Sequence, residues 1–381
     1  MSNFGVAVVG AGFIGPVHVE AIRRAGRTVV GILGVDDKES TSAAKILGIP
    51  RAYKSYEELL GDKAAHAVHI AVPNRYHYAM VKQAIAAGKH VLCEKPLAMN
   101  SKETREMVAL AAKAKTAAAV NYNNRFYPLS IEARERVRRG EVGEIFSVRG
   151  CYVQDWLLYD TDYNWRVLAD EGGELRAVAD IGTHWLDLIH SITGLEIEAV
   201  CADLATIHTV RNRPKGEVET FTGKKKKEQK TEPIKITTDD YGSILIRFKG
   251  GARGCMTVSQ MVAGRKNHLF YEIAGSKRAL AWTNERPDEL WIGHRNEANE
   301  LLLRDPSLVC DEARKSIAFP GGHAEGFPDS FKQLFRAFYN YIDAGDLKAP
   351  APFPTFADGH REVVLCEAIA ASNKKQAWVK V

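Results

Sequence analysis

The sequence predicts an α/β plus α+β protein of two domains, in which a doubly wound parallel sheet precedes a mostly antiparallel open sheet backed by helices. Its 381 residues are too many for one ordinary domain. Residues 1–122 alternate continuous apolar runs with helical periodicity, which is typical of βαβ units on a sheet covered on both faces. Later segments alternate apolar with polar residues, which indicates strands with one exposed face.

The first domain, residues 1–122, contains five expected strands joined by helices. The connections are short, so right-handed crossovers on a parallel sheet are expected. The strands are expected at residues 4–9, 29–33, 67–72, 90–93 and 117–121, and the helices at residues 14–25, 76–87 and 102–114.

The second domain, residues 123–381, is expected to form the open sheet and its supporting helices. Residues 210–233 are polar and lysine-rich without periodicity, so a protruding loop is expected there. Strands are expected at residues 144–153, 243–248, 255–260, 269–274, 279–282 and 378–381, and helices at residues 130–139, 328–344 and 356–373.

Charge and composition argue against nucleic-acid-binding, membrane and disulfide-stabilised proteins. The formal charge of +5 depends largely on lysines 224–227, which we interpret as a solvated loop rather than a DNA or RNA contact. The six cysteines are widely spaced without a Cys-x-x-Cys pair, so neither a zinc site nor a disulfide framework is expected. No apolar run approaches the ~20 residues of a membrane span, and no secretory signal is visible, so we expect a cytoplasmic protein.

A glycine-rich loop, GAGFIG at residues 10–15, directly follows the first expected strand and opens the first expected helix. In this context the first glycine permits a tight turn, the second lets a pyrophosphate approach the backbone, and the third lets helix and strand pack closely. The helix N-terminus offers unpaired N–H groups to the anion. We therefore expect the dinucleotide-binding residues Gly10, Gly12, Phe13, Ile14 and Gly15.

The acidic residue expected about 20 positions further on distinguishes NAD from NADP. Asp36 lies just beyond the second expected strand and can accept a hydrogen bond from the adenosine ribose, which favours NAD. The alternative is that Asp36 caps a helix or forms a turn, and that Lys38 meets the 2′-phosphate of NADP. NAD is the favoured cofactor, with NADP as the alternative.

A lysine ends the fourth expected strand in the segment CEKP at residues 93–96. The carboxyl ends of parallel strands border the crevice in which doubly wound sheets bind ligands, so Lys95 and its neighbour Glu94 are expected there. Pro73, Asn74 and His77 follow the third strand at the same sheet edge and are expected near the cofactor. The alternative is an ordinary surface lysine at a strand end.

Taken together, these motifs resemble the glucose–fructose oxidoreductase, inositol dehydrogenase and rhizopine-catabolism (Gfo/Idh/MocA) family. The resemblance covers essentially the whole chain, and its specificity lies in the order and spacing of the motifs. They are the glycine loop, Pro73-Asn74-x-x-His77, Glu94-Lys95-Pro96, Asn124-Arg125-Phe126, Trp165-Arg166 and Asp180-x-x-x-His184. The resemblance implies a Rossmann domain, with Lys95 beside the nicotinamide and substrate, and with Asp180 and His184 completing the site from the second domain.

The sequence around Asp180 is consistent with that role. Asp180, His184, Asp187 and Ser191 fall on one face of an expected helix, with apolar residues on the opposite face and Gly194 at its end. The polar face meets either solvent or a cleft, and the resemblance favours the cleft. The family usually has a glycine-rich run closer to this aspartate than the glycines at 172–173, which puts the substrate in doubt more than the chemistry.

The substrate pocket is expected between the domains, in a stretch rich in aromatic and hydrogen-bonding side chains. Aromatic faces with carboxylate and amide groups suit a sugar ring, although each aromatic residue taken singly is equally compatible with core packing. Besides Lys95, Asp180 and His184, the expected substrate residues are Tyr122, Asn124, Asp155, Tyr159, Tyr163 and Asn164, and the further expected cofactor residues are Arg125, Trp165 and Arg166.

These residues predict an NAD(P)-dependent dehydrogenase that oxidises a secondary hydroxyl of a sugar, cyclitol or glycoside, with no metal. Either Lys95 or His184 is the base, and Asp180 orients one of them. The rivals are an NADPH-dependent reductase of a sugar ketone or dihydrodiol, and a non-catalytic regulator of the same fold. An apolar open-sheet face and the family's habit predict a homodimer or homotetramer through the second domain.

Overall fold

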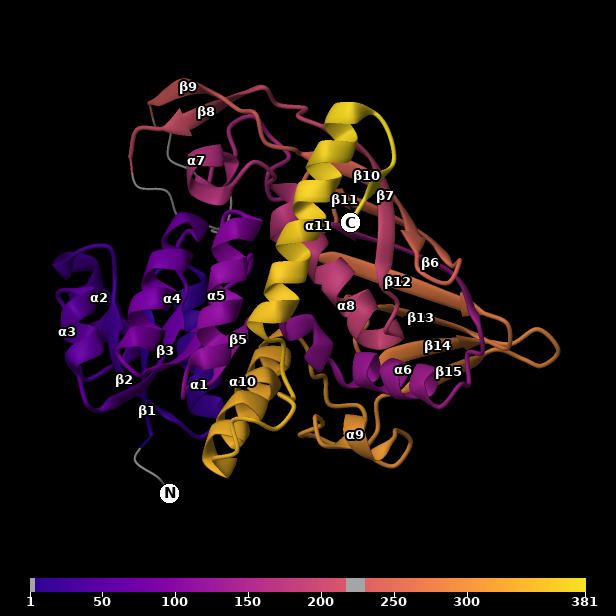
Figure 1. Ribbon diagram of the computed structural model, residues 1–381, viewed down its shortest axis with the longest axis horizontal. Coiled ribbons are helices and arrows are strands. Elements are labelled where there is room, and N and C mark those ends of the chain that lie inside the picture. Colours follow the sequence, from indigo (N-terminus) through magenta and orange to yellow (C-terminus); the bar gives the residue numbers. More distant parts are fainter. Residues whose placement is uncertain (1–3, 217–229) are drawn as a thin grey trace. The chain divides into compact units, whose positions relative to one another are not determined.

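The computed structural model describes residues 4–216 and 230–381, which form two compact units (Figure 1). The first unit extends to Tyr122 and also includes Phe331–Val363; the second consists of Asn123–Ser330 and Val364–Val381. The sequence did not indicate that residues 331–363 pack with the first unit. The assignment of residues 1–122 to cofactor binding and of 123–381 to substrate binding and oligomerisation remains a prediction.

The first unit is built on a five-stranded parallel sheet in the order β2-β1-β3-β4-β5, which confirms the predicted doubly wound sheet. The strands are almost wholly apolar because helices cover both faces. The chain crosses over β1 between β2 and β3, so the strand order reverses there, where sheets of this kind bind ligands. The strands are β1 (Gly5–Val9), β2 (Thr28–Leu33), β3 (Ala65–Ile70), β4 (His90–Cys93) and β5 (Ala118–Val120).

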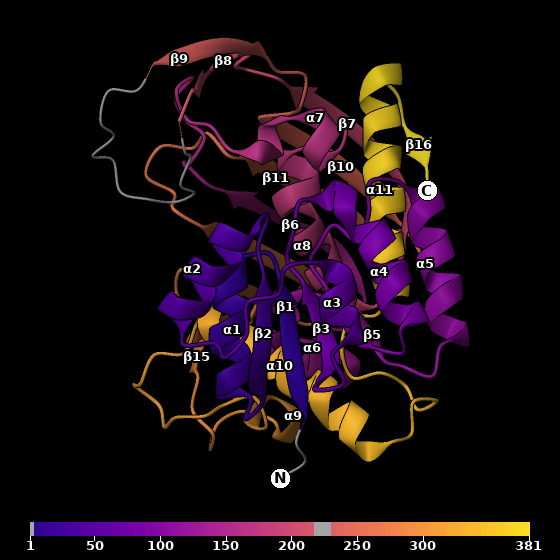
Figure 2. The ribbon, with the colours of Figure 1, turned by 90° about the vertical axis from the view of Figure 1, so that its left-hand side faces the viewer.

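Helices α1–α5 surround this sheet (Figure 2). Two of them, α2 and α3, were not predicted; α3 has only 6 residues, whereas α2 has 11 residues, as many as α1. Each is nevertheless capped by a side chain, since Asp36 accepts from the Glu39 N–H and Ser55 from the Glu58 N–H. The helices are α1 (Ile14–Arg24), α2 (Asp37–Leu47), α3 (Tyr56–Gly61), α4 (His77–Ala86) and α5 (Ser101–Lys113).

The second unit contains a nine-stranded sheet in the order β15-β14-β13-β12-β6-β11-β10-β7-β16. All neighbouring strands are antiparallel except β6 and β11, so the predicted mostly antiparallel sheet is confirmed. The strands are β6 (Ile145–Val153), β7 (Ile197–Ala205), β10 (Tyr241–Phe248), β11 (Arg253–Ser259), β12 (His268–Gly275), β13 (Ala279–Thr283), β14 (Glu289–Gly293), β15 (Glu300–Leu303) and β16 (Val379–Lys380).

Helices α6 (Pro128–Arg138) and α8 (Thr183–Thr193) lie across one face of this sheet (Figure 1). Trp185 of α8 is fully buried against it and donates from Nε1 to the Phe270 carbonyl at 2.9 Å. On alternate positions, Phe146, Leu245 and Leu301 are each more than half exposed. One face therefore forms the core, and the other retains exposed apolar side chains.

The prediction of a loop over residues 210–233 is wrong at both ends, where β8 (Val210–Pro214) and β9 (Thr231–Lys235) pair as antiparallel strands (Figure 2). The hydropathy pattern concealed β8 because its inward residue is Arg211, which is fully buried and ion-paired rather than apolar. The lysine run at 224–227 lies outside the described residues.

The remaining helices are α7 (Ala169–Gly172), α9 (Asp311–Arg314), α10 (Phe327–Ala344) and α11 (Phe356–Lys375). No helix in residues 4–216 and 230–381 is long and apolar enough to cross a membrane. All six cysteines are free thiols, and Cys255 is the exposed one.

Candidate active site

The glycine loop joins β1 to α1, and at two of its glycines there is no room for a side chain. A Cβ on Gly10, whose φ is +101°, would lie 2.1 Å from the Ala71 carbonyl oxygen, and a Cβ on Gly15 would lie 2.0 Å from the Gly10 carbonyl oxygen. A Cβ on Gly12 would meet nothing within 4 Å. The protein's own packing therefore requires the first and third glycines, while the second borders open space of the kind a dinucleotide pyrophosphate needs.

The N-terminus of α1 and the cap of α2 complete this part of the site. No side chain in the described residues caps α1, whose first turn carries no acidic residue, so its N–H groups suit an anion. Phe13, at the helix start, is 46% exposed. Asp36 is exposed and caps α2 through Oδ1, 2.7 Å from the Glu39 N–H. Capping occupies one carboxylate oxygen, so a second role of Asp36 toward a ribose stays a prediction.

The segment after β3 has a structural histidine at its centre. The two ring nitrogens of His77 lie 2.9 Å from the carbonyl oxygens of Val72 and Pro96. Burial lowers the pKa of His77, against the opposing effect of these carbonyls. Pro73 and Asn74 begin the short turn that precedes His77, and Asn74 is buried. His77 thus ties the β3 edge to the segment after Lys95, and we expect it to position that segment.

Glu94 is buried at the end of β4 with three hydrogen-bonding partners. Its Oε1 lies 2.9 Å from His18 Nε2 and accepts from Asn121 Nδ2, and its Oε2 accepts from the Lys95 backbone N–H at 3.2 Å. Burial alone would raise the pKa of Glu94, but His18, the Lys95 charge and Asn121 together lower it to about 2. A fixed carboxylate anion therefore lies directly beside the half-buried Lys95.

In the second unit, Asp180 lies in a π-helical turn, Val178–Gly182, that leads directly into α8. Its two carboxylate oxygens accept separate hydrogen bonds, Oδ1 from Arg166 Nε at 3.2 Å and Oδ2 from Gln260 Nε2 at 2.8 Å. The Arg166 guanidinium also stacks over the Trp165 ring, with its Cζ 4.4 Å from the ring centroid. Such turns occur often at functional sites, and here the turn presents a carboxylate with a fixed orientation.

His184 follows one turn later and is buried beside Tyr152, with 6.1 Å between the ring centroids. The Tyr152 hydroxyl donates to Asn267 Oδ1 at 2.8 Å. Burial raises the pKa of Tyr152, to which the Asp180 charge also contributes. Tyr152 therefore lies beside His184 as a neutral side chain whose hydroxyl proton is donated to Asn267, and it was not predicted as a site residue because it is one of the alternating residues of β6.

Two other predicted site residues are engaged in ion pairs. Arg125 donates to both carboxylate oxygens of Asp187, with Nε 2.7 Å from Oδ2, and the Asp187 side chain is 1% exposed. Asp155 binds Lys266 Nζ at 2.5 Å. Asp187, expected on the polar helix face, thus fixes Arg125 instead of meeting solvent.

The remaining predicted substrate residues differ in exposure. Asn164 caps the turn Trp165–Val167 and accepts from Arg166 Nη1 at 3.1 Å, which links it to the Asp180 cluster. Tyr122 and Asn124 are buried, Tyr163 is half-buried and Tyr159 is 51% exposed.

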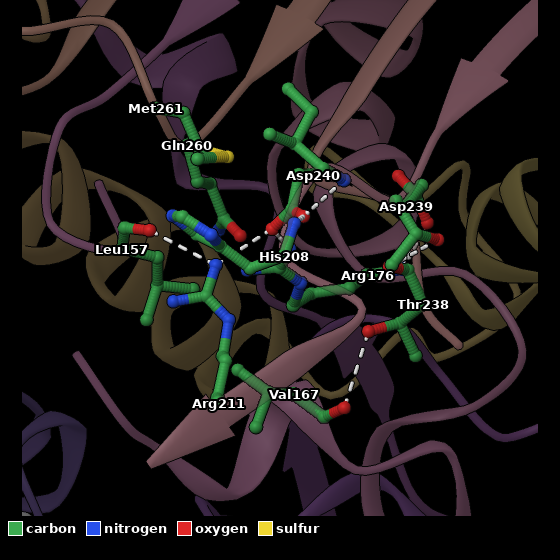
Figure 3. A network of polar contacts seen from close by, with 12 residues as sticks. Leu157, Val167, Arg176, His208, Arg211, Thr238, Asp239, Asp240, Gln260 and Met261 are labelled. Atoms are coloured by element: carbon green, nitrogen blue, oxygen red, sulfur yellow. Dashed lines mark hydrogen bonds and ion pairs between the residues drawn. The ribbon is translucent and has the colours of Figure 1, made fainter. Parts of the chain in front are cut away.

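A buried charged network, which the sequence analysis also missed, holds the start of the Asp180 helix (Figure 3). Asp239 accepts the backbone N–H groups of Arg176 at 2.5 Å and Val178 at 2.9 Å. Asp240 binds the guanidinium groups of both Arg176 and Arg211. The adjacent acids before β10 were the available signal, since consecutive aspartates at a buried strand need partners.

Among the described residues, no group of three His, Cys, Asp or Glu side chains is placed to hold a metal ion. The first unit offers an anion-binding loop and a lysine beside a fixed carboxylate. The second offers an oriented carboxylate and an imidazole. Each set of groups is of a kind that can bind an anion or move a proton.

Comparison with known proteins accounts for both units. The family model for the NAD-binding Rossmann fold of the oxidoreductase family matches residues 4–122, and the model for the Gfo/Idh/MocA C-terminal domain matches residues 131–281. Levoglucosan dehydrogenase from Pseudarthrobacter phenanthrenivorans is 28% identical over 397 aligned positions, covering 100% of this chain and 99% of that protein.

Solved structures extend the match to the whole fold. A levoglucosan dehydrogenase in complex with NADH and L-sorbose is 26% identical, with a TM-score of 0.89 over 100% of this chain and 99% of that one. An oxidoreductase domain protein from Kribbella flavida is 29% identical, with a TM-score of 0.89 over 100% of both chains. Since matching models cover most of the sequence, the chain belongs to the Gfo/Idh/MocA family of oxidoreductases, with an NAD-binding Rossmann fold in its first unit.

Proposed function

We propose that this protein is an NAD-dependent dehydrogenase that oxidises a secondary hydroxyl of a sugar, cyclitol or glycoside. The observation that carries the proposal is the oriented Asp180 carboxylate, bound by Arg166 and Gln260 and followed by His184 on the same helix. An oriented carboxylate followed one turn later by an imidazole is the arrangement that acid–base chemistry on a bound substrate uses.

We propose that Lys95 from the first unit and His184 and Asp180 from the second act on one substrate hydroxyl. When bound, NAD supplies the acceptor for the hydride that leaves the substrate carbon. The hydroxyl proton passes to Lys95 or His184, so that each turnover converts the alcohol to a ketone and releases one proton. In this proposal Asp180 orients one of these two groups, and its own carboxylate is held in place by Arg166 and Gln260.

The substrate class rests on the side chains near Asp180 and on the relatives. Trp165, with Arg166 stacked on it, offers an aromatic face beside hydrogen-bonding groups, and Tyr159 is exposed in the same stretch. Such a combination suits the C–H faces and hydroxyls of a sugar ring. The related dehydrogenase was solved with NADH together with levoglucosan, an anhydrosugar.

Two rivals remain distinguishable. An NADPH-dependent reductase of a sugar ketone or dihydrodiol is disfavoured by Asp36, whose carboxylate would repel a 2′-phosphate. A non-catalytic regulator of the same fold is disfavoured because Lys95 and His184 are both present. The exposed apolar face of the second unit supports the further proposal of a homodimer or homotetramer.

The test is to incubate the purified protein with NAD and then NADP across monosaccharides, anhydrosugars, inositols and glycosides, and to follow the absorbance of the reduced nicotinamide. We expect one polyol class to be oxidised with NAD in preference to NADP. Asp36→Ser, which keeps a capping oxygen but removes the charge, should weaken that preference about tenfold, or ~1.4 kcal/mol. Oxidation of no polyol by a protein that binds NADH would contradict the proposal and favour the regulator.

A further inference from the structure

Four buried polar side chains form a continuous chain through the first unit, from Glu94 to Tyr339 of α10. Glu94 Oε1 lies 2.9 Å from His18 Nε2, His18 Nδ1 lies 2.9 Å from His69 Nδ1, and His69 Nε2 lies 2.9 Å from the Tyr339 hydroxyl. Both histidines are 0% exposed and Tyr339 is 1% exposed. The chain joins four separate elements, β4, α1, β3 and α10.

The hydrogen bonds of this chain fit one direction of donation. The Glu94 carboxylate can only accept, so His18 carries a proton on Nε2, and in the neutral form of His18 the Nδ1 atom accepts from His69. Burial lowers the pKa of His69 well below its ordinary value, so His69 is neutral and its one proton lies on Nδ1. Burial raises the pKa of Tyr339, whose hydroxyl therefore keeps its proton and donates to His69 Nε2.

Aromatic side chains enclose the two histidines. Phe335, which is fully buried, lies against both rings, with centroid separations of 5.1 Å to His18 and 4.6 Å to His69. Phe331 lies against His18 from another direction, at 5.8 Å. In such apolar surroundings each hydrogen bond is strong and a lost partner is costly, so the chain keeps one arrangement.

The other histidines of this unit do not have this connection. The ring nitrogens of His77 face two backbone carbonyl oxygens at 2.9 Å, and His90 Nδ1 accepts from the Ala117 N–H at 2.9 Å. Those contacts satisfy a buried ring and fix local backbone. The His18 chain instead ends on a carboxylate whose other oxygen binds the backbone N–H of Lys95.

We propose that His18, His69 and Tyr339 are positioning residues, whose hydrogen-bonded chain holds the Glu94 carboxylate in one orientation beside Lys95 and thereby keeps Lys95 in place for proton transfer. This inference rests on the proposed function, in which Lys95 acts on the substrate hydroxyl. The side chains of these three residues are 0–1% exposed, so we expect no contact of theirs with substrate or cofactor. Their effect passes through Glu94, so they influence turnover more than binding.

The first test does not depend on activity. Long-range ¹H–¹⁵N spectra of the full-length ¹⁵N-labelled protein report which ring nitrogen of each histidine is protonated, and the signals are assigned with His18→Gln and His69→Gln. We expect the proton on Nε2 in His18 and on Nδ1 in His69. The reverse tautomer in either ring would overturn the chain.

The second test separates positioning from folding. Tyr339→Phe removes one hydroxyl and should lower kcat about threefold to tenfold, while KM and the Kd for NADH stay within twofold. His18→Leu should lower kcat further, about tenfold to a hundredfold. His18→Gln should recover part of the loss, because its amide replaces the Nε2 donor. The matched control is His90→Asn, which keeps an acceptor for the Ala117 N–H and should leave kcat unchanged.

The outcomes separate this inference from the proposed function. Wild-type turnover with unchanged kcat in both Tyr339→Phe and His18→Leu would overturn the positioning role and leave the dehydrogenase standing. A Lys95→Met protein that retains full turnover would instead overturn the role of Lys95 and with it the reason for the chain. Should His18→Leu fail to fold, Tyr339→Phe and the tautomer measurement still decide.

Discussion

Each unit has a buried polar network that fixes its candidate reacting groups, and the two networks differ in how many charges they contain. In the first unit the chain of His18, His69 and Tyr339 ends on a single charge, that of Glu94. In the second unit, Arg176 and Arg211 share Asp240, and all three side chains are 0% exposed. The first network is held together by hydrogen bonds that donate in one direction, and the second by ion pairs between buried charges.

This difference determines what happens when a link is removed. A neutral chain that loses a member leaves unpaired donors or acceptors, each costing about 1–3 kcal/mol. A charged cluster that loses its carboxylate leaves guanidinium groups buried without compensation, which costs about 3–5 kcal/mol. Removing a member should therefore lower the free energy of unfolding by different amounts in the two networks. We expect this difference to be larger than any difference in turnover.

The largest effect is expected from Asp240→Asn. The substitution keeps the shape but removes the buried charge that Arg176 and Arg211 share, so the free energy of unfolding should fall by about 3–5 kcal/mol. Denaturation in urea, followed by circular dichroism, measures it. Glu196→Gln is the control, since its partner Lys249 is exposed and no measurable change is expected. A loss below 1 kcal/mol would contradict the claim that the Asp240 charge compensates the buried guanidinium groups.

A smaller effect is expected from His69→Leu. It leaves His18 Nδ1 and the Tyr339 hydroxyl without their partner, so we expect a loss of about 1–3 kcal/mol in the same urea experiment. Equal losses for His69→Leu and Asp240→Asn would remove the distinction between the networks.

The most specific effect concerns pH. Burial raises the pKa of Asp239 to about 6, so its contribution to stability is present below the unfolded value of about 3.9 and is lost as pH rises to 6. For Glu94, burial is outweighed by its hydrogen bonds, and the pKa falls to about 2. Its contribution is present above about pH 4.3 and is lost as pH falls toward 2.

Urea midpoints measured from pH 3 to 7 check these opposite slopes. Asp239→Asn should remove a decline in stability between about pH 4 and 6, while Glu94→Gln should flatten the acid limb below about pH 4.3. Unchanged profiles in both variants would contradict the assigned protonation states.

Short sequence patterns predicted the parts of the fold that depend on residues close together in the sequence. The third glycine is fixed by a close contact of Gly15 with the Gly10 carbonyl inside the β1–α1 connection, although Gly10 itself lies against Ala71 after β3, and the core face of α8 follows a helical period. The networks could not be predicted, because their partners are distant in sequence. His69 and Tyr339 are 270 positions apart, and Gln260 is 80 positions from Asp180. Arg211 also reversed the hydropathy that would have revealed β8, because its charge is buried and paired.

The most direct test of the central claim, that both units act on one hydroxyl, is a double-mutant cycle on kcat/KM with Lys95→Met and His184→Asn. Each single variant should lose about 10²–10⁴-fold in turnover while still binding NADH. If the two residues serve the same proton transfer, the double variant should be little slower than the slower single variant. Losses that multiply, or a single variant with full turnover, would contradict the account.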